Sequence, residues 1–375
     1  MIDVNTLIQR RIRQDVQSMH AYAIQESTGM VKLDAMENPH RLPPALQEAL
    51  GQRLGALALN RYPDGRVNDL RDALTAYIDM PAGLGLMLGN GSDELISLLA
   101  MACDVPAAAG SAKPVVLAPL PGFVMYAMSA ALQGLDFVGV PLTADFALDT
   151  EAMLQAIAKH QPALVYLAYP NNPTANLWNE TDMASVVQAA GEAGSIVVMD
   201  EAYQPFSSRT WLDQIRANPQ ANQHVLLMRT LSKFGLAGVR LGYMVGAKEL
   251  IDQVNKVRPP YNISVLNYEC ALFALEHADV FAAQAAELRD QRDRLQKAFA
   301  AMPGVHAFES DANMILVRFE GDGDRAQAVF NGLKQRGVLV KNVSKMHPLL
   351  ANCLRMTVGT ADENSLLLKA LEESL

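Results

Sequence analysis

The chain has 375 residues, half of them hydrophobic, and a mean hydropathy near zero, so it can bury a large core and form two domains. Its net charge is −9 and it contains no basic run, which argues against nucleic acid or a membrane surface as a main partner. No apolar run is long enough to span a bilayer, and residues 1–17 lack the pattern of a secretion signal. Cys103, Cys270 and Cys353 form no CxxC pattern, so we expect reduced thiols in a cytoplasmic protein without a metal site.

The first two thirds of the chain predict an α/β fold. Residues 1–45 are a polar arm with few strong elements, and a helix is expected from Asn68 to about Ile78. Apolar runs typical of strands then alternate with helical stretches. Strands are expected at residues 115–118, 137–140, 164–167, 196–199, 225–228 and 241–245, and helices at 93–102, 124–132, 151–159 and 180–193. This alternation predicts a large, mostly parallel sheet covered on both faces.

After Tyr261 the pattern changes and predicts a smaller α+β domain. Expected there are helices at residues 264–276, 279–300, 326–336 and from 363 onwards, and strands at 313–319, 338–341 and 354–358. The predicted organisation is an arm at residues 1–45 that belongs to the small domain, a large domain at 46–275 and a C-terminal small domain at 276–375.

A glycine-rich stretch, Gly83 to Gly89, resembles a dinucleotide-binding fingerprint at first sight. Its spacing is GxGxxxG, we predict no strand before it, and no helix is expected to start at its third glycine. We therefore reject a nucleotide-dependent dehydrogenase.

The segment from Thr230 to Arg240 indicates the chemistry. Lys233 follows an apolar strand, and burial favours the neutral amine, which is a nucleophile for carbonyl groups. Thr230, Ser232 and Arg240 supply hydroxyl and guanidinium donors that suit a phosphate. A lysine that can form an imine, beside phosphate donors, is what pyridoxal phosphate requires, although most lysines are simply exposed.

Other candidate groups also follow predicted strands, where ligands bind in such sheets. The loop with Gly91, Ser92 and Asp93 opens a helix, and a helix N-terminus can bind an anion. Phe123 could stack on a flat ring, or belong to the core. Asn172 lies in an Asn-Asn-Pro turn, where its amide could donate to a phenolate oxygen, although Asn and Pro are also common in ordinary turns.

Asp200 is the sharpest of these candidates. It ends an apolar strand, so it is expected to be buried and to need a partner. A carboxylate beside a pyridine nitrogen keeps that nitrogen protonated and makes the ring an electron sink. Tyr203, three residues further on, could donate to a phenolate oxygen of the same ring. The alternative is a buried aspartate that caps the next loop.

Taken in order, these motifs resemble the fold-type-I pyridoxal-phosphate aminotransferases over nearly the whole chain, and the combination of Asp200-x-x-Tyr203 with Ser232-Lys233 and Arg240 is highly specific. The resemblance implies that Lys233, Asp200 and Tyr203 are catalytic, with Lys233 attached to the cofactor and later moving a proton. It also implies a set of cofactor-binding residues: Gly91, Ser92, Asp93, Phe123, Asn172, Asp200, Tyr203, Thr230, Ser232, Lys233 and Arg240. Tyr62 matches a tyrosine that reaches the neighbouring subunit's cofactor phosphate, which implies a homodimer with shared active sites.

The two ends of the chain resemble the histidinol-phosphate aminotransferase branch of this family, in the segments at residues 19–22, 32–39, 61–64 and 353–360. That resemblance implies glutamate and imidazole acetol phosphate as substrates in histidine biosynthesis. It implies that the substrate is bound by Tyr22, Asn38, Lys341 and Arg355. The guanidinium of Arg355 could serve both substrates, because a guanidinium can bind either a carboxylate or a phosphate in bidentate geometry.

The sequence departs from the pattern of this branch at several positions. Gly122-Phe123 stands where Thr-Tyr is common, Ala175 replaces a glycine, Met36 replaces an asparagine and Lys341 replaces an arginine. The lysine keeps the positive charge but lacks the planar guanidinium of arginine. This difference affects the expected choice of substrate and not the expected cofactor chemistry.

Three alternatives remain open. An aromatic amino acid aminotransferase or a phosphothreonine decarboxylase would share the scaffold and differ around Tyr22, Lys341 and Arg355. A transcriptional regulator would need an added DNA-binding domain, for which the arm is too short and the net charge has the wrong sign. A catalytically dead binding protein is disfavoured by the intact Lys233 and Asp200.

Overall fold

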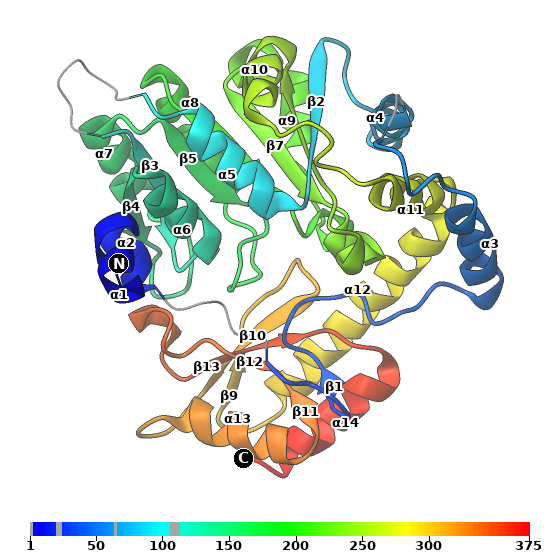
Figure 1. Ribbon diagram of the computed structural model, residues 1–375. Helices are drawn as coiled ribbons and strands as arrows, with labels where there is room; N and C mark the ends of the chain where they lie inside the picture. The colour runs from blue at the N-terminus through cyan, green and yellow to red at the C-terminus, as the bar shows by residue number, and fades with distance from the viewer. Residues whose placement is uncertain (1–2, 20–24, 64–65, 106–112) are drawn as a thin grey trace.

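The protein is built around two sheets, which a long helix joins (Figure 1). The computed structural model describes residues 3–19, 25–63, 66–105 and 113–375. The large sheet lies in the first three quarters of the chain, and the smaller sheet consists of four C-terminal strands. A separate two-stranded sheet pairs an N-terminal strand with a C-terminal one. The predicted fold class, a large mostly parallel sheet domain with a smaller α+β domain, is confirmed; the boundaries at residues 45 and 275 stay predictions.

The large sheet has seven strands in the order β2-β8-β7-β6-β5-β3-β4. Its strands are β2 (Leu84–Gly89), β3 (Val115–Leu120), β4 (Asp136–Pro141), β5 (Leu164–Ala168), β6 (Ile196–Asp200), β7 (Val225–Thr230) and β8 (Gly242–Ala247). In this sheet β8 runs in the direction opposite to the other six strands. The carboxyl ends of those six strands therefore share one edge with the start of β8.

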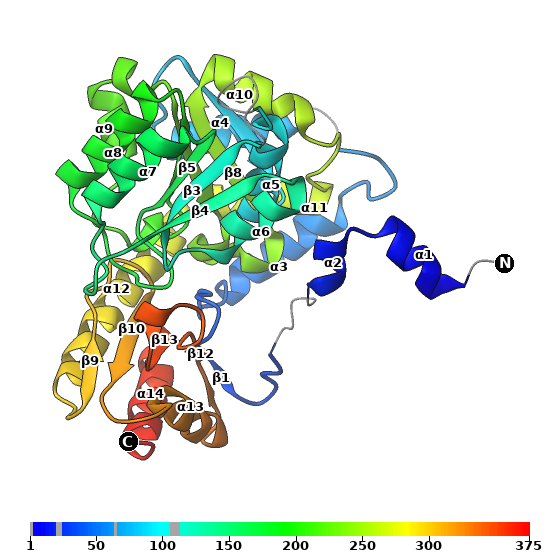
Figure 2. The same ribbon diagram turned by 90° about the vertical axis from the view of Figure 1, so that its left-hand side faces the viewer.

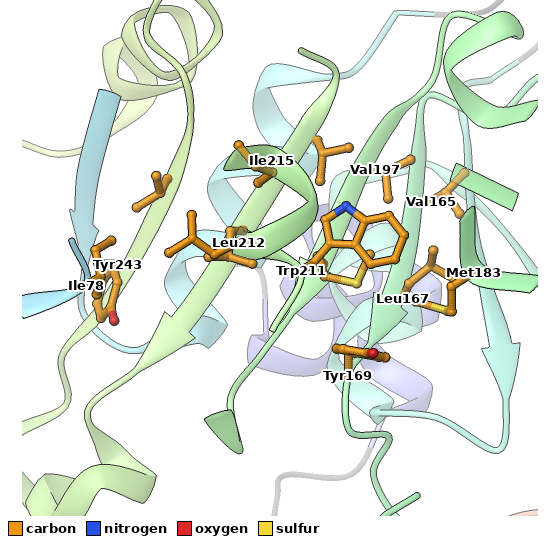
Figure 3. Packing of buried hydrophobic residues seen from close by; sticks show 14 of the residues in the cluster. Ile78, Val165, Leu167, Tyr169, Met183, Val197, Trp211, Leu212, Ile215 and Tyr243 are labelled. Carbon is orange, nitrogen blue, oxygen red and sulfur yellow. The ribbon is translucent and has the colours of Figure 1, made fainter. Parts of the chain in front are cut away.

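Helices cover both faces of this sheet, because successive side chains of a strand point to opposite sides. Val198 and Met228 pack with helices α5 (Ser92–Ala102), α6 (Val124–Gln133) and α10 (Lys248–Val254). Met199 and Leu227 pack on the other face, with α4 (Arg66–Tyr77), α7 (Thr150–His160), α8 (Glu180–Glu192), α9 (Leu212–Ala217) and α11 (Val265–Glu276). Figure 3 shows side chains of this second cluster, among them Trp211 and Val197.

The smaller sheet is antiparallel, with the order β12-β13-β10-β9. Its strands are β9 (Val305–Ala307), β10 (Met314–Phe319), β12 (Lys341–Asn342) and β13 (Cys353–Thr357), and it packs with α12 (Ala278–Ala300), α13 (Arg325–Gln335) and α14 (Ala361–Glu372). Beside it, β1 (Val31–Lys32) pairs with β11 (Val338–Leu339). Helix α12 runs from the large sheet's helices into this part of the molecule (Figure 1).

The arm has more regular structure than the sequence suggested. Helix α1 (Val4–Arg11) begins at Asp3, whose carboxylate accepts hydrogen bonds from the N–H groups of Asn5 and Thr6, and a short helix α2 (Gln14–Ser18) follows. Neither contains a buried residue. Helix α3 (Pro44–Gly55) begins at the end of the arm. Within the described ranges no helix is long and apolar enough to cross a membrane.

Two further predictions need correction. In the described part of the chain no strand directly precedes the glycine-rich stretch, as predicted, but the stretch itself forms the unpredicted strand β2, whose Leu86 and Leu88 pack into the core. The strand predicted at residues 338–341 is two strands, β11 and β12, which pair in different sheets. The other predicted strands are confirmed, with ends shifted by one or two residues.

Candidate active site

The carboxyl edge of the large sheet forms one side of a cavity of about 350 Å³. Side chains reach this cavity from the ends of β6 and β7, the start of α5 and the loops after β3 and β5. The structure brings together most of the predicted cofactor residues: Ser92, Asp93, Phe123, Asn172, Asp200, Tyr203, Thr230, Ser232, Lys233 and Arg240 all line this cavity. Ala35 and Glu37, from the segment after β1, lie opposite them.

Lys233 lies in the helical turn Ser232–Leu236, which follows β7. Its Nζ donates to the carbonyl oxygen of Ala35 at 3.0 Å. Burial, reinforced by the positive charge of Arg355, lowers the pKa of this amine to about 8. A substantial fraction of the amine is therefore neutral and nucleophilic just above neutral pH.

Asp200 ends β6 and is 5% exposed. Its Oδ2 accepts from the hydroxyl of Tyr126 at 2.6 Å and its Oδ1 from the N–H of Ala202 at 3.0 Å. Burial raises the pKa of this carboxyl to about 6, although both hydrogen bonds oppose the rise. The site thus holds a carboxylate that a cationic ring nitrogen would stabilise.

An anion site lies at the N-terminus of α5. Gly91 occupies the N-cap with φ 82°, so no side chain there accepts from the first N–H groups of the helix. A Cβ on Gly91 would lie 2.8 Å from Nη2 of Arg240, and that nitrogen also donates to Asp93 at 3.1 Å. Gly242 packs so closely that a Cβ would lie 2.9 Å from the backbone nitrogen of Ser92. The loop, the arginine and the helix dipole together suit a phosphate.

Two hydroxyls flank this anion site. Thr230 Oγ1 lies 3.0 Å from the Ser232 hydroxyl and accepts from the Ser232 N–H at 3.1 Å. Thr230 lies on the same face of the sheet as Asp200, because Met228 and Val198, two positions earlier on their strands, both pack on that face.

Asn172, Tyr203 and Arg355 form the side of the site nearer the small sheet. Arg355, on β13, donates to Asn172 Oδ1 at 2.7 Å and to the carbonyl oxygen of Asp34 at 2.8 Å. Tyr203 is buried and packs with Met36 and Ala175, two departures noted in the sequence. Met36 and Ala175 both have positive φ values, 52° and 66°, which suit the asparagine and glycine they replace.

Some predicted residues do not line this cavity. Tyr62 is 76% exposed and stacks on Tyr261, with ring centroids 4.6 Å apart. Asn38 donates to Gln284 of α12 and lines an adjoining cavity of about 300 Å³. Lys341 pairs directly with Arg355 across β12 and β13, which places two cations side by side. Tyr22 lies outside the described residues. Gly91 and Arg355 also lie outside the lining of this cavity, and the roles predicted for all the site residues stay predictions.

Sequence reasoning missed two features of the site. Tyr126, one helical turn after Phe123, holds Asp200, and its position three residues after an aromatic cavity residue was an available signal. Behind the cavity, Glu201 accepts from Arg229 at 3.0 and 2.9 Å, and both side chains are buried. Acidic and basic residues inside apolar strands indicate such a pair. Among the described residues no group of three or more His, Cys, Asp or Glu side chains could hold a metal ion.

This arrangement suits a flat ring that carries an anionic group at one end and a basic nitrogen at the other. The amine of Lys233 would lie beside such a ring. The sequence profile of the family described as aminotransferase class I and II matches residues 28–371. The histidinol-phosphate aminotransferases of Polaromonas naphthalenivorans and Paracidovorax citrulli are 68% and 66% identical to the chain, covering 98% and 97% of it and 97% of each relative. The chain therefore belongs to the class I and II aminotransferases and, within them, to the family of histidinol-phosphate aminotransferases.

Solved structures agree with this placement. The crystal structure of histidinol-phosphate aminotransferase from Sinorhizobium meliloti in complex with pyridoxal-5'-phosphate has a TM-score of 0.82 at 25% identity, over 97% of both chains. The enzyme of the same name from Clostridium acetobutylicum has a TM-score of 0.80 at 20% identity, over 91% of this chain and 98% of that chain, and shows the fold alone.

Proposed function

We propose that the protein transfers an amino group between glutamate and imidazole acetol phosphate, giving histidinol phosphate and 2-oxoglutarate in histidine biosynthesis, with pyridoxal 5'-phosphate as cofactor. The observation that carries the proposal is the cavity in which the Lys233 amine, the Asp200 carboxylate and the uncapped start of α5 meet. The names of the most similar relatives support the choice of substrate.

The residues of the cavity fit this cofactor at both ends. The N-terminus of α5, with Arg240, Thr230 and Ser232, offers donors for its phosphate, and Asp200 offers a buried carboxylate for its ring nitrogen. Phe123 borders the place of the ring. When bound, pyridoxal phosphate supplies an electron sink for negative charge at the substrate's α-carbon.

Each catalytic side chain then has a defined task. Asp200 holds a proton on the ring nitrogen, and its own two donors fix its direction. The Lys233 Nζ, whose pKa of about 8 lies near neutral, accepts the proton of the α-carbon and later returns a proton. Asn172 and Tyr203 also line the cavity and would orient the ring through hydrogen bonds to its phenolate oxygen.

Arg355 and Lys341 are the proposed binding groups for the substrate's anion. The bonds from Arg355 to Asn172 and Asp34 hold the guanidinium in place, and Lys341 lies beside it on β12. A guanidinium binds either a carboxylate or a phosphate with two parallel hydrogen bonds. One site can therefore serve glutamate and histidinol phosphate in turn.

We also propose a homodimer in which Tyr62 contributes to the partner subunit's site. Tyr62 is largely exposed to solvent, and the apolar residues Leu59 and Tyr261 near it are also exposed, as expected of a surface that a partner covers. The cysteines Cys103, Cys270 and Cys353 are free thiols, which supports a reducing compartment such as the cytoplasm.

The deciding experiment mixes the purified, cofactor-loaded enzyme with histidinol phosphate and, separately, with phenylalanine, and follows the visible absorbance of the cofactor. Rapid bleaching with histidinol phosphate alone is the expected result. Bleaching only with phenylalanine would move the substrate to aromatic amino acids, and release of carbon dioxide from phosphothreonine would indicate a decarboxylase. A protein that develops no visible band after pyridoxal phosphate is added would refute the cofactor assignment.

A further inference from the structure

Tyr126 links helix α6 to the end of β6. The residue lies in the first turn of α6, is 3% exposed and lines the cavity. Its hydroxyl donates to Asp200 Oδ2 at 2.6 Å, while the other oxygen, Oδ1, accepts from the backbone of Ala202. Each oxygen of the carboxylate therefore has a donor from a different part of the chain, so the carboxylate plane is fixed.

Two aromatic neighbours fix the ring of Tyr126 in turn. It stacks on Tyr166 of β5, with centroids 4.3 Å apart and planes 13° apart, and meets Phe123 edge to face at 5.6 Å. The hydroxyl of Tyr166 is also buried, but it has no hydrogen-bond partner in the described part of the chain. Two stacked, buried tyrosines thus differ in one respect: only Tyr126 bonds to Asp200.

The groups around Asp200 make the hydrogen bond from Tyr126 important for the pKa of its carboxyl. Burial is the main influence that raises the pKa of Asp200, and Asp93 of α5 and Glu201, the next residue in the chain, raise it further. The hydroxyl of Tyr126 is the largest influence that lowers it, followed by the N–H of Ala202. Tyr203 and Tyr166 also interact with this carboxyl, but burial raises their pKa values, so both stay neutral. Lys233 lines the same cavity, and its pKa of about 8 is common to the wild type and both tyrosine variants compared below.

We propose that Tyr126 is a positioning residue, whose hydroxyl keeps Asp200 ionised and directed into the cavity so that the cofactor's ring nitrogen binds tightly at neutral pH. The inference rests on the proposed function. It predicts that loss of the Tyr126 hydroxyl weakens cofactor binding through its effect on Asp200, and that the size of this loss of affinity depends on pH.

The test compares Tyr126→Phe with Tyr166→Phe, which removes the unpartnered hydroxyl of the same ring stack. The dissociation constant of pyridoxal phosphate is measured with each apoenzyme from pH 6 to 9. In Y126F the pKa of Asp200 rises, so near pH 6.5 the cofactor should bind about tenfold more weakly than in the wild type. The deficit should shrink toward pH 9, where the carboxyl is ionised in both proteins. Y166F should follow the wild type throughout.

A double-mutant cycle then asks whether Tyr126 acts through Asp200. In a D200N background, Y126F should change the dissociation constant by less than about twofold. Infrared titration of the apoenzymes, with D200N as the reference, should show the Asp200 carboxyl losing its proton at a higher pH in Y126F.

Several results would overturn the inference: equal affinity of Y126F and the wild type, a loss of the same size at every pH, a matching loss in Y166F, or an additive loss with D200N. A wild-type protein that fails to bind pyridoxal phosphate would instead refute the proposed function. The two failures are therefore distinguishable.

Discussion

At the scale of single residues, the surroundings of Lys233 determine the pH at which it can react. Its pKa of about 8, lowered from 10.5 by burial and by Arg355, means that the free amine fraction rises with pH, reaches one half near pH 8 and levels off at higher pH. The rate at which apoenzyme and pyridoxal phosphate develop a visible band should follow the same curve in stopped-flow measurements. A midpoint near 10 would contradict the burial argument.

Lys233→Ala is the matched variant for this measurement. It should lose transamination and the visible band, yet still bind the cofactor through the donors at the start of α5. Retained turnover would refute the role given to the lysine.

The sequence predicted most of the cavity because of one rule: ligands bind at the carboxyl ends of parallel strands. Asp200, Thr230 and Lys233 each follow an apolar run, so the rule placed them together. The sequence did not reveal the partner of Asp200, because the bond from Tyr126 depends on how α6 packs across β5 and β6. The role proposed for Tyr62 in a second subunit came from the family resemblance alone, because the apolar pattern does not show which loop faces a partner.

At the scale of elements, the pair formed by Glu201 and Arg229 joins the ends of β6 and β7 on the face opposite the cavity. Removing one partner leaves the other charge buried, so Glu201→Leu should lower the free energy of unfolding by about 3–5 kcal/mol. The double variant E201L/R229M should recover most of that loss, because an apolar pair needs no charge compensation. Urea unfolding of the apoenzymes measures both, and an E201L variant as stable as the wild type would disprove the effect.

Strand β8 supports the anion site through Gly242. A methyl group there would meet Gly91 at 2.8 Å and push the start of α5 away. Gly242→Ala should therefore weaken cofactor binding about tenfold in an equilibrium titration. Gly246→Ala is the control: it lies on the same strand and is crowded by Leu226 at 2.5 Å, far from the loop. G246A should destabilise the fold without this loss of affinity, and equal losses in both variants would contradict the prediction.

The elements that could be read from the sequence were those with strong patterns: uninterrupted apolar runs for β5, β6 and β7, and helical periodicity for α12. Strand β2 was missed because its glycines resembled a loop, although Leu86 and Leu88 fill the core. The division of residues 338–341 between β11 and β12 depends on pairing with β1 and β13, which are distant in sequence.

At the scale of the whole molecule, each active site of the proposed homodimer contains residues from both chains. Besides the exposed Tyr62, helix α1 carries the exposed apolar residues Val4 and Leu7 and projects from the body of the protein (Figure 2). A K233A chain lacks its own lysine but offers an intact Tyr62, and a Tyr62→Ala chain does the opposite. Refolding the two impaired variants together should therefore restore activity, through the one complete site of each hybrid dimer.

Gel filtration gives the control for this hybrid experiment, because the refolded mixture must elute as a dimer. Activity no higher than the average of the two separate variants, or a fully active wild-type monomer, would exclude the shared site.

The strand pairing of β1 also has a consequence for the order in which the protein can be completed during synthesis. The N–H of Met36 bonds to the Thr357 hydroxyl across 321 residues of sequence, and Ala35, its neighbour, accepts from the Lys233 amine. A ribosome needs on the order of tens of seconds to add that many residues. Until β11 and β13 emerge, residues 31–36 lack their partners Gly337, Leu339 and Thr357, so we expect the enclosure of the reactive amine to be among the final events of folding. In chains that stop short of β11, none of this pairing can form, and we expect the segment to cover the amine less firmly.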